Sequence, residues 1–192
     1  MTMHFGMTGG ACYEEKGRVP DRHDRLVIDF NEKGHLVFND QRKFGAISYA
    51  ESPQAFIEQK RLGPDALTVS KKEFVERAIS HRKPIKATLL DQHVVAGIGN
   101  LYSDEVLFQT KVHPSILSSE LSPRRMGHVH RAMGEVLRAS IDARSDFCLL
   151  PEGYMLRDRS AGAPCPRGNG HLKAMVVGGR TAFFCPSCQP SP

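Results

Sequence analysis

The sequence predicts an α+β fold in which a sheet comes first, a helical bundle follows and a cysteine-rich hairpin ends the chain. Three observations support this order. Short β-branched and aromatic runs between turn residues fill residues 1 to about 50, a pattern typical of strands. Capping residues and apolar positions at helical spacing follow, from residue 70 to about 143. Beyond them, the spacing of Cys165, Cys185 and Cys188 is typical of a zinc-binding hairpin.

The strands are predicted from local runs and turns. Residues 26–30 and 35–38 are apolar runs on either side of the turn-forming segment 31–34, so we expect a β-hairpin. Residues 44–49 predict another strand. Residues 62–67 are rich in turn formers, and we expect the main domain boundary there.

Two helices have clear start signals. Ser70 caps a predicted helix over residues 71–80, and Glu73 completes a capping box. Ser122 and Pro123 begin a long helix that extends to about residue 143. Its apolar stripe, which we assign to the core, comprises Val129, Met133, Val136, Leu137 and Ile141.

Between these helices, residues 85–95 predict a helix that ends at the glycines of residues 97–99. Asn100 then opens a helix that runs through residue 108. The N–H groups at such a helix start can bind an anion, although a plain corner capped by an Asn has the same pattern. The basic residues Lys86 and 81–83 could neutralise phosphates nearby, or could simply form a solvated face.

Composition restricts the class of protein. The 192 residues are 40% apolar, enough for one or two small domains with a real core. The chain contains no apolar run long enough to span a membrane, and its first residues do not resemble a secretory signal. We therefore expect a cytoplasmic protein without membrane contacts. The net charge of +5 is compatible with a polyanionic partner.

The C-terminal hairpin is one ligand short of a four-cysteine zinc site. Cys185 and Cys188 form one complete pair, but in the upstream pair Gly168 stands where the partner of Cys165 belongs. His171 could supply a nitrogen and complete a Cys3His site for Zn2+. The alternative is a hairpin that has lost zinc and retains its cysteines as small buried groups.

Residues 40–45 place Arg42 and Lys43 next to Phe44. This pairing suits a protein that reads duplex DNA, with charge for phosphates or a base edge and an aromatic wedge for an opened stack. Met7 is a candidate second wedge. The alternatives are that Phe44 lies in the core and that Met7 fills a gap.

Taken together, these segments resemble the formamidopyrimidine-DNA glycosylase/endonuclease VIII family of base-excision repair enzymes. The resemblance covers essentially the whole chain, and the matching segments occur in family order: residues 4–9, 40–45, 62–64, 95–102 and the hairpin ending at Cys185 and Cys188. It implies a partial N-terminal β-sandwich over residues 1–60. It further implies a helix–two-turn–helix domain over residues 61–150 and a zinc-finger hairpin over residues 151–192.

The resemblance also implies a role for single residues. Met7, Arg42 and Phe44 would fill the gap left by a flipped base. The other contacts to DNA would come from His4, His23, His81 or Arg82, Asn100 and Arg180. Arg180 would grip the phosphates beside the lesion and assist elimination. The implied partner is double-stranded DNA with a damaged base or an abasic site, bound by a monomer associated with the nucleoid.

The implied activity is removal of an oxidised base followed by strand cleavage through β,δ-elimination. In the family, the amine of an N-terminal proline attacks the sugar, in a segment reading Met-Pro-Glu-Leu-Pro-Glu, and a lysine on an early strand assists. These features are absent from the 192 residues. Three hypotheses follow: a fragment of a complete enzyme that is inactive alone, a non-catalytic binder of damaged DNA, or chemistry by another amine such as Thr2 or a lysine. An unrelated zinc-ribbon binder is a further alternative, and it would not need Met7, Arg42 and Phe44.

Overall fold

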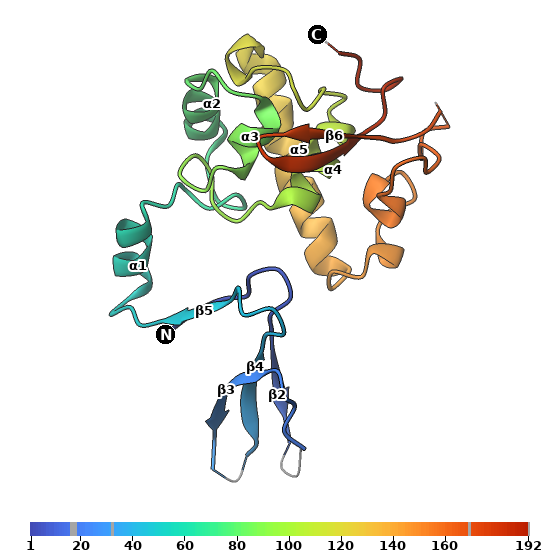
Figure 1. Ribbon diagram of the computed structural model, residues 1–192. Coiled ribbons are helices and arrows are strands. Elements are labelled where there is room, and N and C mark those ends of the chain that lie inside the picture. Colours follow the sequence, from blue (N-terminus) through green and yellow to red (C-terminus); the bar gives the residue numbers. More distant parts are fainter. Residues whose placement is uncertain (16–18, 32, 169, 192) are drawn as a thin grey trace. The chain divides into compact units, whose positions relative to one another are not determined.

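The computed structural model describes residues 1–15, 19–31, 33–168 and 170–191. The chain forms two compact units, Met1–Lys60 and Arg61–Pro192. Among the described residues no helix is long and apolar enough to cross a membrane. The elements, shown in Figure 1, are β1 (Thr2–His4), β2 (Gly10–Glu14), β3 (Asp24–Asp29), β4 (His35–Asn39), β5 (Ala46–Ser48), α1 (Pro53–Lys60), α2 (Lys71–Ile79), α3 (Ile85–Leu90), α4 (Asn100–Gln109), η1 (Ser118–Glu120), α5 (Pro123–Asp142), η2 (Phe147–Leu149), η3 (Met155–Asp158), β6 (Lys173–Val177) and β7 (Arg180–Phe184).

The first unit contains two small antiparallel sheets. β1 pairs with β5, and β4 lies between β2 and β3. The predicted hairpin over residues 26–38 is confirmed, with Leu26 opposite Phe38 and Ile28 opposite Leu36. Glu32, in its predicted turn, lies outside the described residues. The predicted strand over residues 44–49 forms as the shorter β5.

Helix α1 was not predicted from the sequence. It buries none of its residues and has no apolar stripe, so the main signal for a helix is missing. The remaining signal is at its start, where Ser52 Oγ accepts a hydrogen bond from Ala55 N (3.0 Å) and Pro53 is the first helical residue. The same Ser-Pro pair starts α5, and it would have sufficed to find α1.

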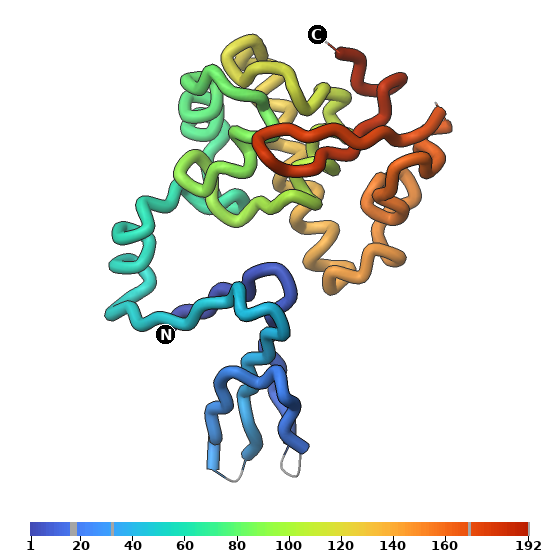
Figure 2. The backbone as a smooth tube through the Cα atoms, viewed as in Figure 1, coloured from blue at the N-terminus to red at the C-terminus, as the bar shows by residue number. Residues whose placement is uncertain are grey.

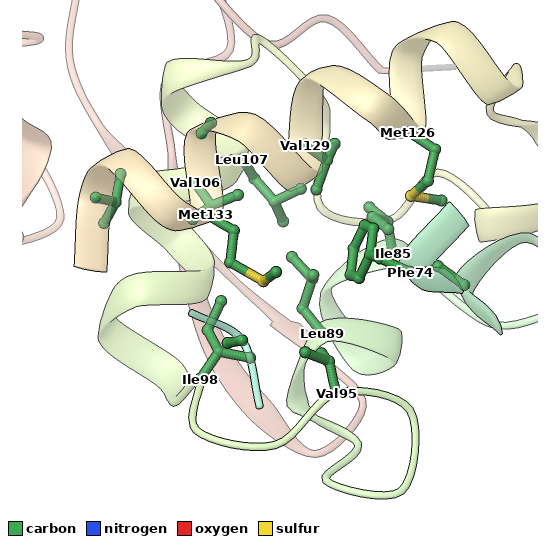
Figure 3. Close-up of a cluster of buried hydrophobic side chains, with 14 of the residues drawn as sticks. Phe74, Ile85, Leu89, Val95, Ile98, Val106, Leu107, Met126, Val129 and Met133 are labelled. Carbon is green, nitrogen blue, oxygen red and sulfur yellow. The ribbon is translucent and has the colours of Figure 1, made fainter. Parts of the chain in front are cut away.

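The second unit is a helical bundle with the predicted caps. Ser70 Oγ accepts from Glu73 N (3.2 Å) at the start of α2, and Ser122 Oγ accepts from Arg125 N (3.3 Å) at the start of α5. One apolar cluster packs α2, α3, α4 and α5 together, and burial of each large side chain in it contributes about 1.5–3 kcal/mol. Figure 3 shows its centre, formed by Phe74, Ile85, Leu89, Val95, Ile98, Val106, Leu107, Met126, Val129 and Met133.

Two predictions for this unit were wrong. The helix expected over residues 85–95 ends at Leu90, because the Asp91 carboxylate accepts a hydrogen bond from His93 N (2.9 Å) and turns the chain. Ile141, expected in the core, is 60% exposed, whereas Ser140 beside it is 3% exposed and bonded to Tyr102 of α4, so this turn buries its neighbouring face instead.

The chain ends in the hairpin of β6 and β7, which lies against α4 (Figure 1). Figure 2 follows the backbone from α5 through a connector, residues 147–162 (orange), to this hairpin (red). Lys173 pairs with Phe184 at its base and Val177 with Arg180 at its tip. The two-residue turn of Gly178 and Gly179 has positive φ at both positions (57° and 74°), a conformation that glycine adopts readily.

Candidate functional site

Two loops of the first unit are joined by Asp40, a side chain that is only 1% exposed. Its carboxylate accepts hydrogen bonds from Gly45 N (2.6 Å), Thr8 Oγ1 (3.2 Å) and Arg42 N (3.2 Å). The bond from the Gly45 amide is the main reason that the pKa of Asp40 lies below its ordinary value. Asp40 therefore ties the loop around Thr8 to the loop that follows β4.

The same two loops bring the three predicted wedge residues to the surface. Gly6 has a φ of 61°, and a Cβ added there would lie 2.6 Å from the carbonyl carbon of Phe44, so the two backbones are in close contact. Met7 is 67% exposed and Phe44 is 57% exposed. The Arg42 guanidinium carbon lies 5.0 Å from the centre of the Phe44 ring, within the range of a cation–π contact. Phe44 and Met7 are thus surface residues, and the alternatives that placed them in a core or a gap are wrong.

Two predicted DNA-contacting histidines also belong to this unit, His4 before the first loop and His23 between the two loops in the sequence. His4 is exposed, and its Nδ1 accepts a hydrogen bond from Gly6 N (3.1 Å), which in the neutral ring leaves Nε2–H as a donor. His23 is half-buried, with its Nδ1 3.1 Å from Asp21 Oδ1, and its backbone carbonyl accepts from Asp40 N (2.9 Å).

In the second unit, the start of α4 is open. Its N-cap residue is Gly99, which has no side chain to satisfy the first N–H groups. Gln92 shapes the approach, because its side chain accepts from Gly97 N (3.0 Å) and donates to the Ile98 carbonyl (3.0 Å). Asn100 is half-buried, and among the described residues its Oδ1 is buried without a hydrogen-bond partner. Such a helix start favours an anion.

The basic residues between α2 and α3 do not act as one group. His81 is half-buried and Arg82 is exposed, so Arg82 is the more available to a ligand. Lys83 forms an ion pair with Asp91. Lys86 is fully buried, so neither alternative considered for it, a phosphate contact or a solvated face, is correct.

Lys86 belongs to a buried network centred on Asp104 of α4. Lys86 Nζ donates to Asp104 Oδ1 and to the Thr181 carbonyl (3.2 Å). Asp104 Oδ2 accepts from Arg159 (Nη2 2.6 Å, Nε 3.0 Å) and from Phe183 N (3.1 Å). Burial lowers the pKa of Lys86, and the charge of Asp104 opposes that shift. The network fixes β7 to α3 and α4.

Arg180 lies at the tip of the hairpin. It is exposed and is the first residue of β7, directly after the glycine turn. A Cβ added to Gly178 would come within 3.0 Å of the Ala87 Cβ, so the turn packs tightly on α3. The position of Arg180 is therefore set by a fixed turn.

The three cysteines of the hairpin form one buried cluster. The Sγ atoms of Cys165, Cys185 and Cys188 all lie within 4.8 Å of one another, and those of Cys165 and Cys188 are 3.7 Å apart. Three close thiols could hold a metal ion. His171 is exposed and is not a member of this cluster, and Gly168 has no side chain to offer. The described residues thus fit three positions of the predicted zinc site.

The comparisons with known proteins agree with this arrangement. The model of the formamidopyrimidine-DNA glycosylase N-terminal domain matches residues 1–47, and that of the H2TH domain of the same enzyme matches residues 62–148. A formamidopyrimidine-DNA glycosylase from Chloroflexus aurantiacus is 33% identical over 202 residues, covering 98% of this chain and 72% of that protein. The chain belongs to the formamidopyrimidine-DNA glycosylase family.

Other members of the family give the same result. The enzyme of that name from Streptococcus pyogenes is 35% identical over 186 residues, covering 89% of this chain and 68% of that protein. A crystal structure of the Lactococcus lactis glycosylase non-covalently bound to DNA with an AP site superposes with a TM-score of 0.85 at 28% identity, covering 98% of this chain and 73% of that one. A complex of the same glycosylase with DNA containing N7-benzyl-Fapy-dG also has a TM-score of 0.85 and 28% identity, covering 98% and 74% of the two chains. Members of this family are DNA glycosylases that bind DNA and act in DNA repair.

Several residues that shape these sites were missed from the sequence. Asp104 and Glu105 are both buried on α4, and Glu105 accepts from Leu156 N (2.8 Å) in the connector. Burial is the main reason that the pKa of Glu105 is raised. The sequence carries no local signal for their burial, because Asp and Glu are mostly exposed unless a partner from elsewhere in the fold pairs with them.

Proposed function

We propose that this chain binds duplex DNA at a damaged or abasic site, as part of a bifunctional DNA glycosylase and AP lyase that removes oxidised bases. The observation that supports this most directly is the exposed group of Met7, Arg42 and Phe44, held by two loops that Asp40 ties together. An exposed aromatic ring leaves apolar surface in contact with water, which is unfavourable. Insertion of the ring into an opened base stack would bury that surface.

The remaining contacts follow from exposure and charge. Arg180 would bind the phosphates that flank the lesion, since it is exposed on a rigid turn. Asn100, at the open start of α4, would bind a further phosphate. His4, His23 and either His81 or Arg82 would add contacts to the DNA backbone.

The proposed chemistry is attack of an amine on C1′ of the sugar, which displaces the base. The C1′–O4′ bond then breaks, O4′ takes up the proton that the amine loses, and the ring-opened sugar is held as an iminium. Successive β- and δ-elimination would then break both phosphate bonds. The base leaves as the glycosidic bond breaks and takes up a proton, and Arg180 would stabilise the phosphate that leaves on elimination. The alternative is a relative that binds damaged DNA without catalysis.

We further propose that this protein acts as a cytoplasmic, nucleoid-associated monomer.

Borohydride trapping on duplex DNA with one abasic site tests the chemistry, because reduction converts an iminium into a stable adduct. A trapped band would assign the nucleophile to these residues, and peptide mapping would distinguish the N-terminal amine from a lysine. Binding to the same duplex without a band would favour the non-catalytic alternative or an enzyme whose amine lies outside these residues. Equal affinity for abasic and intact duplex would contradict damage recognition altogether.

A further inference from the structure

The cysteine cluster differs from a closed structural zinc site in ligand number. Such sites use four protein ligands in a tetrahedron, whereas a site with three protein ligands has one position open. Cys165, Cys185 and Cys188 are 3%, 0% and 6% exposed, and their sulfur atoms converge. The question is whether another side chain of the hairpin can reach the same point.

Strand geometry places His171 on the other side of its segment. His171 pairs with Pro164, while Cys165 N donates to the Gly170 carbonyl (2.7 Å) and Leu172 N to the Ala163 carbonyl (2.8 Å). Side chains alternate between faces along paired strands. Cys165 and Leu172 belong to the buried cluster, so the alternation directs His171 to solvent, where the structure has it.

Gly168 occupies the place of the missing cysteine and retains the local turn. Its N–H donates to the Cys165 carbonyl (2.8 Å), and its φ is 73°. A Cβ added at Gly168 would meet no atom within 4 Å. The turn of a metal-binding loop is therefore present, with free space where a fourth ligand would start.

Arg167 holds this loop in place by other means. Its guanidinium donates to the Phe108 carbonyl (2.9 Å), the Gln109 carbonyl (3.3 Å) and Gln109 Oε1 (3.2 Å), and its Cζ lies 4.2 Å from the centre of the Phe108 ring. These carbonyls end α4, where a cation is also favoured by the helix dipole.

Gln189 does the same for the loop of Cys185 and Cys188. The side chain is 1% exposed; its Oε1 accepts from Cys185 N (3.0 Å) and its Nε2 donates to the Val112 carbonyl (2.8 Å). Both cysteine loops are thus attached to the helical unit through contacts that need no metal.

We propose that the three thiolates bind one thiophilic divalent metal ion and are its only ligands among the residues that the structure describes, with the fourth position open to water or a small ligand. Arg167 and Gln189 fix the two loops in place of the fourth protein ligand. Soft thiolates select such ions. A hard ion such as Ca2+ or Mg2+ prefers oxygen ligands in larger number, and a buried set of three sulfurs does not offer them. The proposal concerns metal binding and does not depend on DNA repair activity.

Titration of the reduced, metal-free chain with Cd2+ tests the ligand count, because each bound thiolate adds to the ultraviolet charge-transfer band. We expect one equivalent to bind. The band should keep its intensity in His171→Ala and fall by about a third in Cys185→Ser, one ligand of three. Cys148→Ser, at an exposed cysteine outside the cluster, is the matched control and should change nothing. A tenfold loss of Cd2+ affinity in His171→Ala, or no band in the unaltered chain, would overturn the proposal.

Visible spectra of the Co2+-loaded chain test the open position. Azide should shift the d–d bands of the unaltered protein, because it can enter the fourth site, and should shift them less in Gly168→Cys. Bands that do not shift on addition of azide would mean a closed site and would contradict the proposal.

Hydrogen exchange of the metal-free protein tests the role of the loops. The amides of residues 173–184 should remain protected in the unaltered chain. They should lose protection in Arg167→Lys, which keeps the charge and loses the forked hydrogen bonds. Full exchange of the unaltered hairpin without metal would refute the role of Arg167.

Discussion

Lys86 and Asp104 form an ion pair in which neither side chain is exposed to solvent. The pair joins α3 to α4, and Asp104 also accepts hydrogen bonds from the Arg159 side chain and from a backbone N–H of β7. Burial of charge is costly unless each charge has a partner, and here two cations, Lys86 and Arg159, share the one carboxylate of Asp104. The position of the hairpin thus depends on a buried pair that also bonds to Thr181, the residue directly after Arg180.

Removal of this carboxylate should be severe. Asp104→Asn leaves Lys86 and Arg159 without their counter-charge, so we expect a loss of about 3–5 kcal/mol in the free energy of unfolding, measured by urea denaturation. The double variant Lys86→Met, Asp104→Leu removes both charges and should recover part of this loss. A single variant as stable as the unaltered protein would mean that the pair is not buried in solution.

The turn of the hairpin should be sensitive at one glycine more than at its neighbour. Gly178→Ala forces a positive φ and a contact with Ala87, for a cost of roughly 1–3 kcal/mol. Gly179→Ala has a positive φ in open space and serves as the matched control, costing roughly 1 kcal/mol. Denaturant unfolding of both variants isolates the contact between the hairpin and α3. Equal losses would show that no such contact exists.

Phe44 should affect damaged DNA more than intact DNA. Phe44→Ala should weaken binding to abasic-site duplex by about 1–3 kcal/mol, because a base stack would lose its wedge. Tyr49→Ala, an aromatic that is 80% exposed in the same unit, is the control. Fluorescence of 2-aminopurine beside the abasic site reports the stacking directly. Identical behaviour of the two variants would argue against the wedge.

Arg180 should contribute one phosphate contact. Arg180→Ala should weaken binding to abasic-site DNA and reduce the slope of log K against log salt by about 1, with little effect on folding. Lys173→Ala removes an equal charge from the base of the same hairpin and should leave binding nearly unchanged. Titrations at several salt concentrations distinguish the two variants. Wild-type affinity in Arg180→Ala would count against the assignment.

The loops around Asp40 should loosen in acid. The pKa of Asp40 lies below its ordinary value of 3.8, chiefly through the Gly45 amide, so the folded state binds fewer protons than the unfolded state in that interval. The stabilisation is therefore complete above pH 3.8 and is lost as the pH falls toward the lowered pKa. The amide shift of Gly45 in NMR spectra should follow this change, and it should be flat in Asp40→Asn. A midpoint above the ordinary value would contradict the hydrogen-bonded carboxylate.

The features that the sequence predicted well are those set by neighbouring residues. The caps at Ser70 and Ser122 depend on a side chain and an amide three residues apart, and the β3–β4 hairpin depends on two runs beside one turn. The end of α3 at Leu90 was missed because the decisive bond, from His93 N to the Asp91 side chain, competes with a helix that its residues would otherwise favour.

By itself, the sequence determined the order of sheet, bundle and hairpin, the identity of the wedge candidates and the family, because periodicity, capping and motif spacing are local or ordered along the chain. Only the structure showed that Met7 and Phe44 are exposed. Tertiary structure decided which charges are buried and which cysteine neighbours can reach a metal. Lys86, Asp104, Arg159 and Phe183 meet from four separate segments. His171 is only six residues from Cys165, yet the pairing of its strand directs it away. Neither the burial of this charge network nor the exposure of His171 can be read from the spacing of residues along the sequence, since both depend on which faces the folded chain brings together.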